Sequence, residues 1–363
     1  MRLEIEDGIG AASLTAAIAD FAAAHDRDGS FPKEAFGELS NRGLVSTPPV
    51  GIGEMRHLLA LLVAVGEGDL SAGRIFEGHV NAVWLVKRFA KGAALDAAIS
   101  ALDGGAVLGV WNTDAPDAPL RLVNDILDGK KNFASGADGL THAIVTVTQS
   151  EGRRMLLVPL TGLPIDRSWW NPVGMRSSGS HVVDFTGFQI GDVHRIGTSD
   201  DYVQQPWFSA GAIRFLAVQT GGMKAILSIA LDHLKTSGRA ENPYQGHRIA
   251  RMAGAVETAL LWLERCAELW KSAERQPSPQ SFAQLKAAAN GARGVVERLA
   301  MRLLDDAEQA IGAAGMNAPH RFERVMRDMR MYLRQPNPDG AAMAFGAAVA
   351  EGDWNLTTLD GSR

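Results

Sequence analysis

Apolar residues in this chain change their spacing twice, and this double change constrains the fold more than any other feature of the sequence. Residues 1–105 carry them at helical spacing, residues 106–203 in short β-branched runs broken by Gly, Asp, Asn and Pro, and residues 204–363 again at helical spacing. We therefore expect two α-helical regions flanking a β region, a mainly helical α+β arrangement. Helices are expected near residues 13–26, 32–44, 55–66, 72–90 and 92–101, and four longer ones at 207–236, 245–273, 278–314 and 319–333.

Two local patterns add detail to this prediction. In the first expected helix, Leu14, Ile18 and Phe21 share one stripe and should face the core. In the β region, the pair Asp128–Gly129 separates two strand-like runs, which predicts a hairpin turn. The β region as a whole is typical of an antiparallel sheet or barrel.

Composition limits the class of protein. The chain has 363 residues, 46% of them hydrophobic, which is enough for a large buried core. Its formal net charge of -5 leaves no basic excess to follow a phosphate backbone, so nucleic acid is not an expected partner. The single cysteine, Cys266, excludes an intrachain disulfide. The start lacks a secretory pattern and the apolar run at 58–65 is too short for a bilayer, so we expect a soluble cytoplasmic protein without a membrane partner.

Five segments, in this order along the chain, resemble motifs of the acyl-CoA dehydrogenase family. They are FPKEAFGELSNRGL at 31–44, LDGKKNFASGAD at 127–138, GMRSSGSHVVDF at 174–185, QAIGAAGM at 309–316 and ERVMRDMR at 323–330. The resemblance implies an N-terminal α-helical domain (1–105), a middle β-barrel domain (106–203) and a C-terminal four-helix bundle (204–363). It also implies an FAD-dependent oxidoreductase.

The resemblance places three residues at the flavin ring. Phe133 matches an aromatic residue that packs against the ring, and its alternative is a position in the core of a strand. Ser135 matches a residue whose hydroxyl and backbone N–H reach the ring edge, where donors favour the charge of a reduced flavin. Thr113, in WNTDAP at 111–116, is a looser match that a plain loop explains equally well.

Further cofactor contacts come from the GMRSSGS segment. Arg176, Ser178 and Ser180 would lie along the flavin tail, since hydroxyls and closely approaching backbone bind a phosphate or a ribose. Without the family context, a Gly/Ser-rich connector is an equal alternative.

Four residues would contact the FAD of a neighbouring subunit. Arg239 matches an Arg at a helix end that binds the pyrophosphate, although the aromatic residue that usually follows it is out of register. Gln309, Gly312 and Gly315 match a turn that holds the cofactor through backbone donors, and an ordinary helix C-cap is the alternative. Shared sites of this kind imply a homodimer or homotetramer.

The catalytic base of the family is missing from both of its usual places. Most members carry a Glu shortly after the Arg-Asp helix, where this chain has Pro336. Others carry a Glu immediately before an Arg on the first bundle helix, where Ile213 precedes Arg214. Asp339, three residues past the first place, is a speculative base, and its alternative is a turn residue.

Three functions follow from this pattern. The first is dehydrogenation of an acyl thioester with FAD and an electron-transfer partner. The second belongs to a related branch, two-component monooxygenases, which take reduced flavin from a separate reductase, react it with oxygen and need no such base. His79 could then act near the flavin, although a packed histidine is the usual alternative. The third is a non-catalytic binding or assembly protein of the same fold. Trp169 and Trp170 are expected to fill the barrel rather than to line a pocket.

Overall fold

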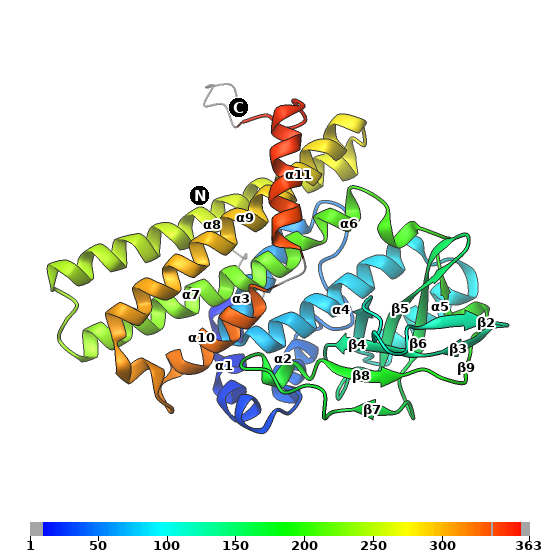
Figure 1. The fold of residues 1–363 in the computed structure, drawn as a ribbon, viewed down its shortest axis with the longest axis horizontal. Coiled ribbons are helices and arrows are strands. Elements are labelled where there is room, and N and C mark those ends of the chain that lie inside the picture. Colours follow the sequence, from blue (N-terminus) through cyan, green and yellow to red (C-terminus); the bar gives the residue numbers. More distant parts are fainter. Residues whose placement is uncertain (1–9, 335–336, 357–363) are drawn as a thin grey trace.

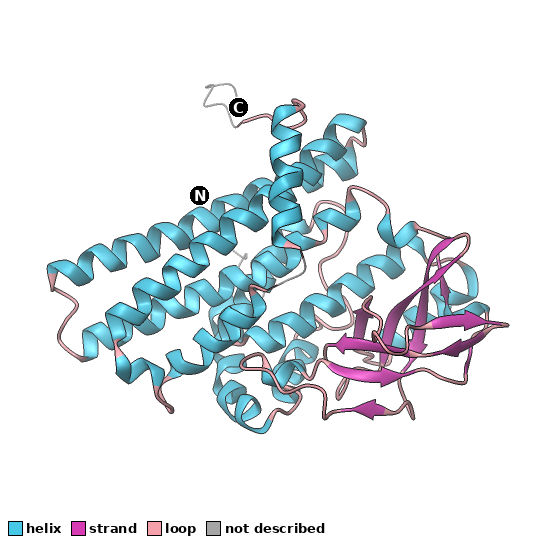
Figure 2. Cartoon of the chain, in the orientation of Figure 1, coloured by secondary structure: helices cyan, strands magenta, loops and turns pink. Residues whose placement is uncertain are grey.

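The computed structural model describes residues 10–334 and 337–356. Helices form the first and last parts of the chain, and strands lie between them (Figures 1 and 2). The five helices expected before residue 105 are present as α1 (Ala11–Asp28), α2 (Lys33–Asn41), α3 (Met55–Gly68), α4 (Leu70–Phe89) and α5 (Gly92–Asp103). On α1, Leu14 and Ile18 are buried as expected, but Phe21 is exposed and Ala22 takes its place in the core.

The strands form three small sheets, and the described strands do not close into the barrel that was expected. One sheet has the order β1-β5-β6-β10, another β2-β3-β9 and the third β4-β8-β7. Strands β1 and β5 pair in parallel, so the region is not wholly antiparallel. Most of the strands are too short for a continuous ladder around an axis. Their bounds are β1 (Leu108–Trp111), β2 (Arg121–Val123), β3 (Ile126–Asp128), β4 (Lys130–Ala134), β5 (His142–Gln149), β6 (Gly152–Pro159), β7 (Ile165–Asp166), β8 (His181–Asp184), β9 (Phe188–Gln189) and β10 (Arg195–Ile196).

The Asp128–Gly129 pair does not make the expected hairpin. At Gly129 the chain passes from β3 into β4, which belongs to a different sheet. Gly129 has φ +114, and an added Cβ would lie 2.5 Å from the carbonyl oxygen of Pro119. The hairpin turn is instead at Asn124–Asp125, between β2 and β3, where both residues have positive φ. A glycine next to Asp therefore marks a close backbone approach here, not a turn.

The helical second half contains the four long helices that the spacing predicted. They are α7 (Ala212–Thr236), α8 (Pro243–Arg275), α9 (Pro279–Ile311) and α10 (Arg321–Tyr332), preceded by the short α6 (Trp207–Ala210). Helix α7 crosses α3 so closely that a Cβ at Gly221 would lie 2.2 Å from the carbonyl oxygen of Val63. One hydrophobic core therefore runs from α3 and α4 into the bundle.

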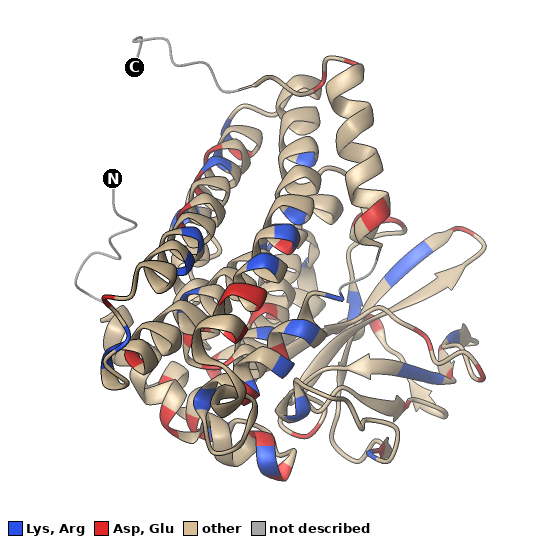
Figure 3. Cartoon of the chain, turned by 60° about the vertical axis from the view of Figure 1, so that its left-hand side comes forward, with Lys and Arg blue, Asp and Glu red and all other residues tan. Residues whose placement is uncertain are grey.

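A further helix, α11 (Pro338–Ala350), was not predicted. It packs on α9, where Phe345 lies over Gly291 (Figure 1). Almost all of its residues are small or apolar, so they show no helical alternation of apolar and polar positions. Among the described residues, none of the helices combines the length and the apolar character that a membrane span needs. Acidic and basic residues are interspersed over the helices (Figure 3).

Candidate functional site

Three of the expected cofactor residues meet in a buried group of hydroxyls, which we call the serine cluster. The Ser180 hydroxyl lies 2.8 Å from that of Ser135, which follows β4, and 2.9 Å from that of Ser178, in the 3-10 turn Arg176–Ser178. The indole N–H of Trp111 donates to the carbonyl oxygen of Ser135 at 3.1 Å, and the N–H of Gly136 donates to that of Ser178 at 2.7 Å. These bonds bring together two segments that are more than 40 residues apart.

Counting hydrogens shows what the serine cluster can bind. Three hydroxyls carry three protons, and the two hydroxyl–hydroxyl bonds use two of them. One hydroxyl proton is therefore left for an outside acceptor. On β4, three residues before Ser135, the side-chain oxygen of Asn132 is buried and has no hydrogen-bond partner among the described residues. The site can thus take a ligand that presents both an acceptor and a donor.

Phe133 is held outward by its backbone. It has φ +50, a conformation that non-glycine residues rarely adopt, and it lies where the pairing of β4 with β8 shifts register. Its side chain is 48% exposed, so it is not in the core of a strand. Trp169 stands edge-on to it with ring centroids 4.8 Å apart, and Trp170 stacks on Trp169. Because Trp169 is 42% exposed, these tryptophans do not fill a barrel, and the three rings form an open aromatic surface.

Thr113 contributes through its backbone. Its carbonyl oxygen accepts the N–H of Asn132 at 3.1 Å, which holds the irregular part of β4, and its side chain is exposed. Thr113 therefore lies beside the residues expected at the flavin ring.

The segment that carries Ser178 and Ser180 is anchored to α10. The N–H of Met175 donates to a carboxyl oxygen of Asp328 at 2.6 Å. At Gly174 an added Cβ would lie 2.3 Å from the carbonyl oxygen of Arg327, so only glycine allows this approach. The Arg327-Asp328 pair of the ERVMRDMR segment thus fixes the position of the GMRSSGS segment.

Asp328 shares its site with a second buried carboxyl. Arg324 lies 3.4 Å from Asp328 and 3.5 Å from Asp69, and among the described residues it is the one guanidinium between them. Burial raises the pKa of Asp328 to about 7, Arg324 opposes this, and Asp69 adds to it. The pKa of Asp69 is also raised by burial. One guanidinium cannot neutralise two buried carboxylates, so the pair holds a proton near neutral pH.

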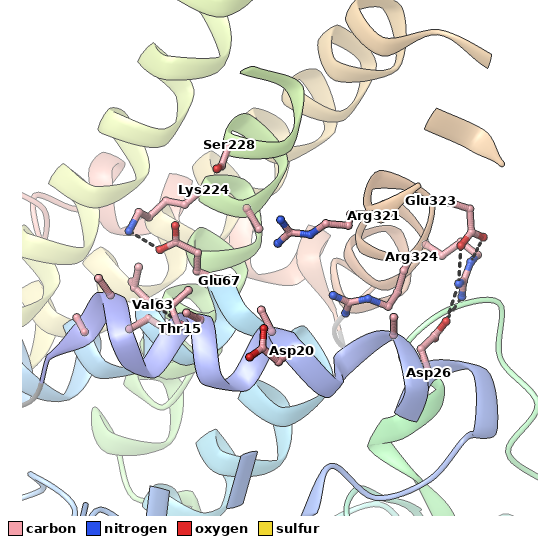
Figure 4. A pocket seen from close by; sticks show the side chains of 18 of the residues that line it. Thr15, Asp20, Asp26, Val63, Glu67, Lys224, Ser228, Arg321, Glu323 and Arg324 are labelled. Atoms are coloured by element: carbon pink, nitrogen blue, oxygen red, sulfur yellow. Dashed lines mark hydrogen bonds and ion pairs between the residues drawn. The ribbon is translucent and has the colours of Figure 1, made fainter. Parts of the chain in front are cut away.

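Arg176 points away from the serine cluster, into a groove of about 1700 Å³ between α1, α3, α7, α8 and α10. None of the three serines lines this groove. In Figure 4, Arg321 and Arg324 extend toward it from α10, and Lys224 pairs with Glu67 at 2.5 Å. Arg327 pairs with Asp26 at 2.8 Å. The charged side chains that line the groove are therefore largely balanced within the chain.

The residues expected at a neighbour's cofactor lie together at the end of the bundle far from the sheets (Figure 1). Arg239 contacts a ring nitrogen of His233 at 2.8 Å and donates to Ser237 at 3.1 Å and to the carbonyl oxygen of Ile311 at 3.5 Å. The guanidinium is thus already held by its own chain. Gln309 accepts from Arg248 at 3.3 Å; Gly312 has φ +82 and ends α9, and Gly315 is buried against Ile311.

His79 is fully buried and both ring nitrogens are used. One lies 2.8 Å from the carbonyl oxygen of Val45, and the other accepts the N–H of Leu108 at 3.0 Å. Burial lowers the pKa of His79 to about 4. This geometry is that of a histidine packed in the core. A hydrogen bond from His79 to a ligand would require breaking one of these two contacts.

The buried neutral His79 predicts a loss of stability in acid. Below pH 6.5 the unfolded chain takes up a proton that the folded chain does not, so stability falls between about pH 6.5 and 4. His79→Gln should be less stable than wild type at pH 7 but should lose less stability on acidification. Urea midpoints at pH 7 and 4.5 measure this, with the exposed His57→Gln as the control. Equal acid losses in wild type and His79→Gln would contradict it.

The expected base positions carry no buried free carboxylate. Pro336 lies outside the described residues, and Ile213 is an apolar core residue. Asp339 is exposed in the first turn of α11.

Sequence reasoning missed a group of largely buried polar side chains next to Ile213. We call it the α4–α7 polar cluster; it consists of Arg74, Glu77 and Asn81 on α4, Arg214 on α7 and Tyr332 at the end of α10. Burial raises the pKa of Tyr332, and the further effects of Glu77 and Arg74 on that pKa place its hydroxyl near them. Glu77 lies 2.8 Å from Arg74 and 3.8 Å from Arg214, and Arg214 also donates to the side chain of Asn81. The i, i+3, i+7 spacing of the α4 residues was the available signal.

Comparisons with known proteins agree with this architecture. Residues 201–333 match the family model "Acyl-CoA dehydrogenase, C-terminal domain". The chain is 26% identical over 347 residues to L-evernosamine nitrososynthase from Micromonospora sp., covering 85% of this chain and 81% of that protein. It is 26% identical over 240 residues to amino sugar nitrososynthase DnmZ from Streptomyces peucetius, covering 60% of this chain and 56% of that protein, so this match spans little more than half of the relative.

Solved structures share the fold over almost the whole chain. Dibenzothiophene monooxygenase TdsC from Paenibacillus sp. A11-2 superposes with a TM-score of 0.83 at 20% identity, covering 97% of this chain and 99% of that one. KijD3, in complex with FMN and a dTDP-linked amino sugar, superposes with a TM-score of 0.82 at 21% identity, covering 97% and 96%.

Proposed function

We propose that this chain, a divergent member of the acyl-CoA dehydrogenase family, is a flavin-dependent monooxygenase that receives reduced flavin from a separate reductase. The proposal rests on the residues that this chain has where the acyl-CoA dehydrogenase family carries its catalytic base. Ile213 is apolar, Asp339 is exposed, and the nearby Glu77 is paired with guanidinium groups. Removal of a proton next to a thioester carbonyl requires a free carboxylate, whereas oxygen transfer does not. The dehydrogenase that the resemblance first suggested is therefore the weaker reading.

The residues around the serine cluster fit a flavin. The free hydroxyl proton and the unpartnered oxygen of Asn132 suit the polar edge of a flavin ring, and the exposed Phe133 offers it an aromatic face. Bound reduced flavin would supply the two electrons and two protons with which one oxygen atom of O2 is transferred to the substrate and the other leaves as water. The chain itself would orient the ring through Ser135 and Ser180 and exclude water with Trp169.

FMN suits this chain better than the FAD expected from the motifs. KijD3 is described with FMN, and Arg239, the expected pyrophosphate ligand, is already bound by His233, Ser237 and Ile311. An FAD tail would have to compete with these contacts. The shared site in a homodimer or homotetramer stays a proposal that rests on Gln309, Gly312 and Gly315.

The proposed function predicts selective binding of reduced FMN. Anaerobic titration of the purified chain should show reduced FMN binding at least about tenfold more tightly than oxidised FMN, because donors at the ring edge favour the reduced anion. FAD in both redox states and a panel of acyl-CoA thioesters serve as comparisons. Tight binding of oxidised FAD with bleaching by a thioester would instead establish a dehydrogenase. Binding of no flavin would leave the non-catalytic alternative.

A further inference from the structure

The α4–α7 polar cluster contains hydrogen-bonding atoms that the chain leaves unused. Arg214 is 3% exposed and Tyr332 is 2% exposed. The Nη1 of Arg214 and the Oη of Tyr332 have no hydrogen-bond partner among the described residues, while the Nε of Arg214 faces Glu77 at 3.8 Å, an ion-pair distance. Buried polar groups are nearly always hydrogen-bonded, and those that are not mark strain or a missing ligand. Two unused atoms in one group therefore point to a ligand.

The charges of the cluster indicate the sign of that ligand. Two guanidiniums, of Arg74 and Arg214, face one carboxylate, Glu77. A guanidinium donates and never accepts, so the unused Nη1 of Arg214 requires an acceptor. The net positive charge favours an anion and opposes an ammonium group.

Two tryptophan rings lie beside Arg214. Its guanidinium carbon lies 5.9 Å from the centre of the Trp84 ring and 5.8 Å from that of Trp270. Because the two rings are themselves 5.8 Å apart, they lie on the same side of the guanidinium and do not enclose it. Its N–H groups can therefore still meet a small acceptor group.

The place of the cluster in the fold connects it with the substrate. Arg214 directly follows Ile213, and Tyr332 ends α10 just before the segment that contains Pro336. One of the two positions where the family that this chain resembles carries its base, Ile213, is therefore the direct neighbour of a cluster residue. We infer that the α4–α7 polar cluster binds the anionic end of the substrate, a small organic oxyanion such as a carboxylate or a sulfonate. This inference rests on the proposed function, since it names a property of that enzyme's substrate.

Matched pairs of probes test the inference. Calorimetric titration of the flavin-free chain with benzoate against benzamide, and with benzenesulfonate against benzenesulfonamide, compares ligands of nearly equal shape that differ in charge. Each anion should bind at least about tenfold more tightly than its neutral partner, as expected for hydrogen bonds to a charged group. Equal affinity within both pairs, including no binding of any probe, overturns the inference.

Two variants assign the effect to the cluster. Tyr332→Phe removes only an unpartnered hydroxyl, so its stability should be equal to or above that of wild type, while its affinity for the anions should fall by about three- to tenfold. Arg214→Gln should abolish the preference for the anion over the neutral partner. The control is Tyr244→Phe, whose side chain is 74% exposed on α8 and which should bind like wild type. Unchanged anion affinity in Tyr332→Phe and in a folded Arg214→Gln also overturns the inference.

Affinity for reduced FMN, measured on the same proteins, separates this inference from the proposed function. Tyr332→Phe should keep wild-type flavin affinity. Loss of the anion preference with intact flavin binding supports the subsite. A wild-type chain that selects anions but binds no reduced flavin would refute the monooxygenase and leave the anion site standing.

Discussion

Ser180→Ala should lower the affinity for reduced FMN by about tenfold to a hundredfold. Ser180 is the middle member of the serine cluster, so its loss breaks both hydroxyl–hydroxyl bonds at once. Ser135 and Ser178 then lose the partner that orients their protons, and the proton left for a ligand no longer has a fixed direction. Anaerobic fluorescence titration with reduced FMN measures the effect.

Ser177→Ala is the matched control. Ser177 belongs to the 3-10 turn that carries Ser178 and is as buried as Ser180, but its hydroxyl makes no hydrogen bond within the described chain. It should therefore bind reduced FMN within about twofold of wild type. Similar losses in the two variants would mean that the turn acts through packing alone, and an unchanged Ser180→Ala would remove the serine cluster from the flavin site.

The order of helices and strands was predictable because apolar spacing reports burial directly. Leu14 and Ile18 on α1, and the four long stretches that became α7 to α10, follow from a 3.6-residue period that tertiary packing reinforces. Closure of the β region was not predictable. Whether strands form a barrel or separate sheets depends on non-local register, and short strands such as β9 and β10 specify it weakly.

Within the site, local motifs pointed to residues that the structure brings together, whereas residues defined by contacts across the chain were not found from the sequence. Ser135, Ser178 and Ser180 stand in recognisable segments, and the structure brings them together. Trp169 was assigned to the core because large aromatic residues are usually buried, yet the outward-turned Phe133 gives it a partner at the surface. Glu77 and Arg214 lie 137 residues apart, and only the crossing of α4 and α7 pairs them.

The buried pair Asp69 and Asp328 predicts stability that falls as the pH rises. In the folded chain the pKa of Asp328 is about 7, whereas in the unfolded chain an Asp titrates near 3.9. Between these values the folded state holds a proton that the unfolded state has lost, so stability declines from about pH 4 to 7, by on the order of 4 kcal/mol at most. His79 acts in the opposite direction in acid, so the effect must be read as a difference between variants.

Asp328→Asn and Asp328→Ala isolate this proton. Asn keeps an oxygen for the N–H of Met175 and cannot ionise, so Asp328→Asn should match wild type near pH 4.5 and exceed it by a few kcal/mol at pH 8. Ala removes the acceptor and should cost about 1–3 kcal/mol at every pH. Urea denaturation of the three proteins from pH 4.5 to 8 measures both effects. Parallel curves for wild type and Asp328→Asn would show that Asp328 is ionised in the folded chain throughout. A rise in the Asp328→Asn curve relative to wild type would show that the anchor of the GMRSSGS segment carries a proton, and that raising the pH weakens the support of the serine cluster.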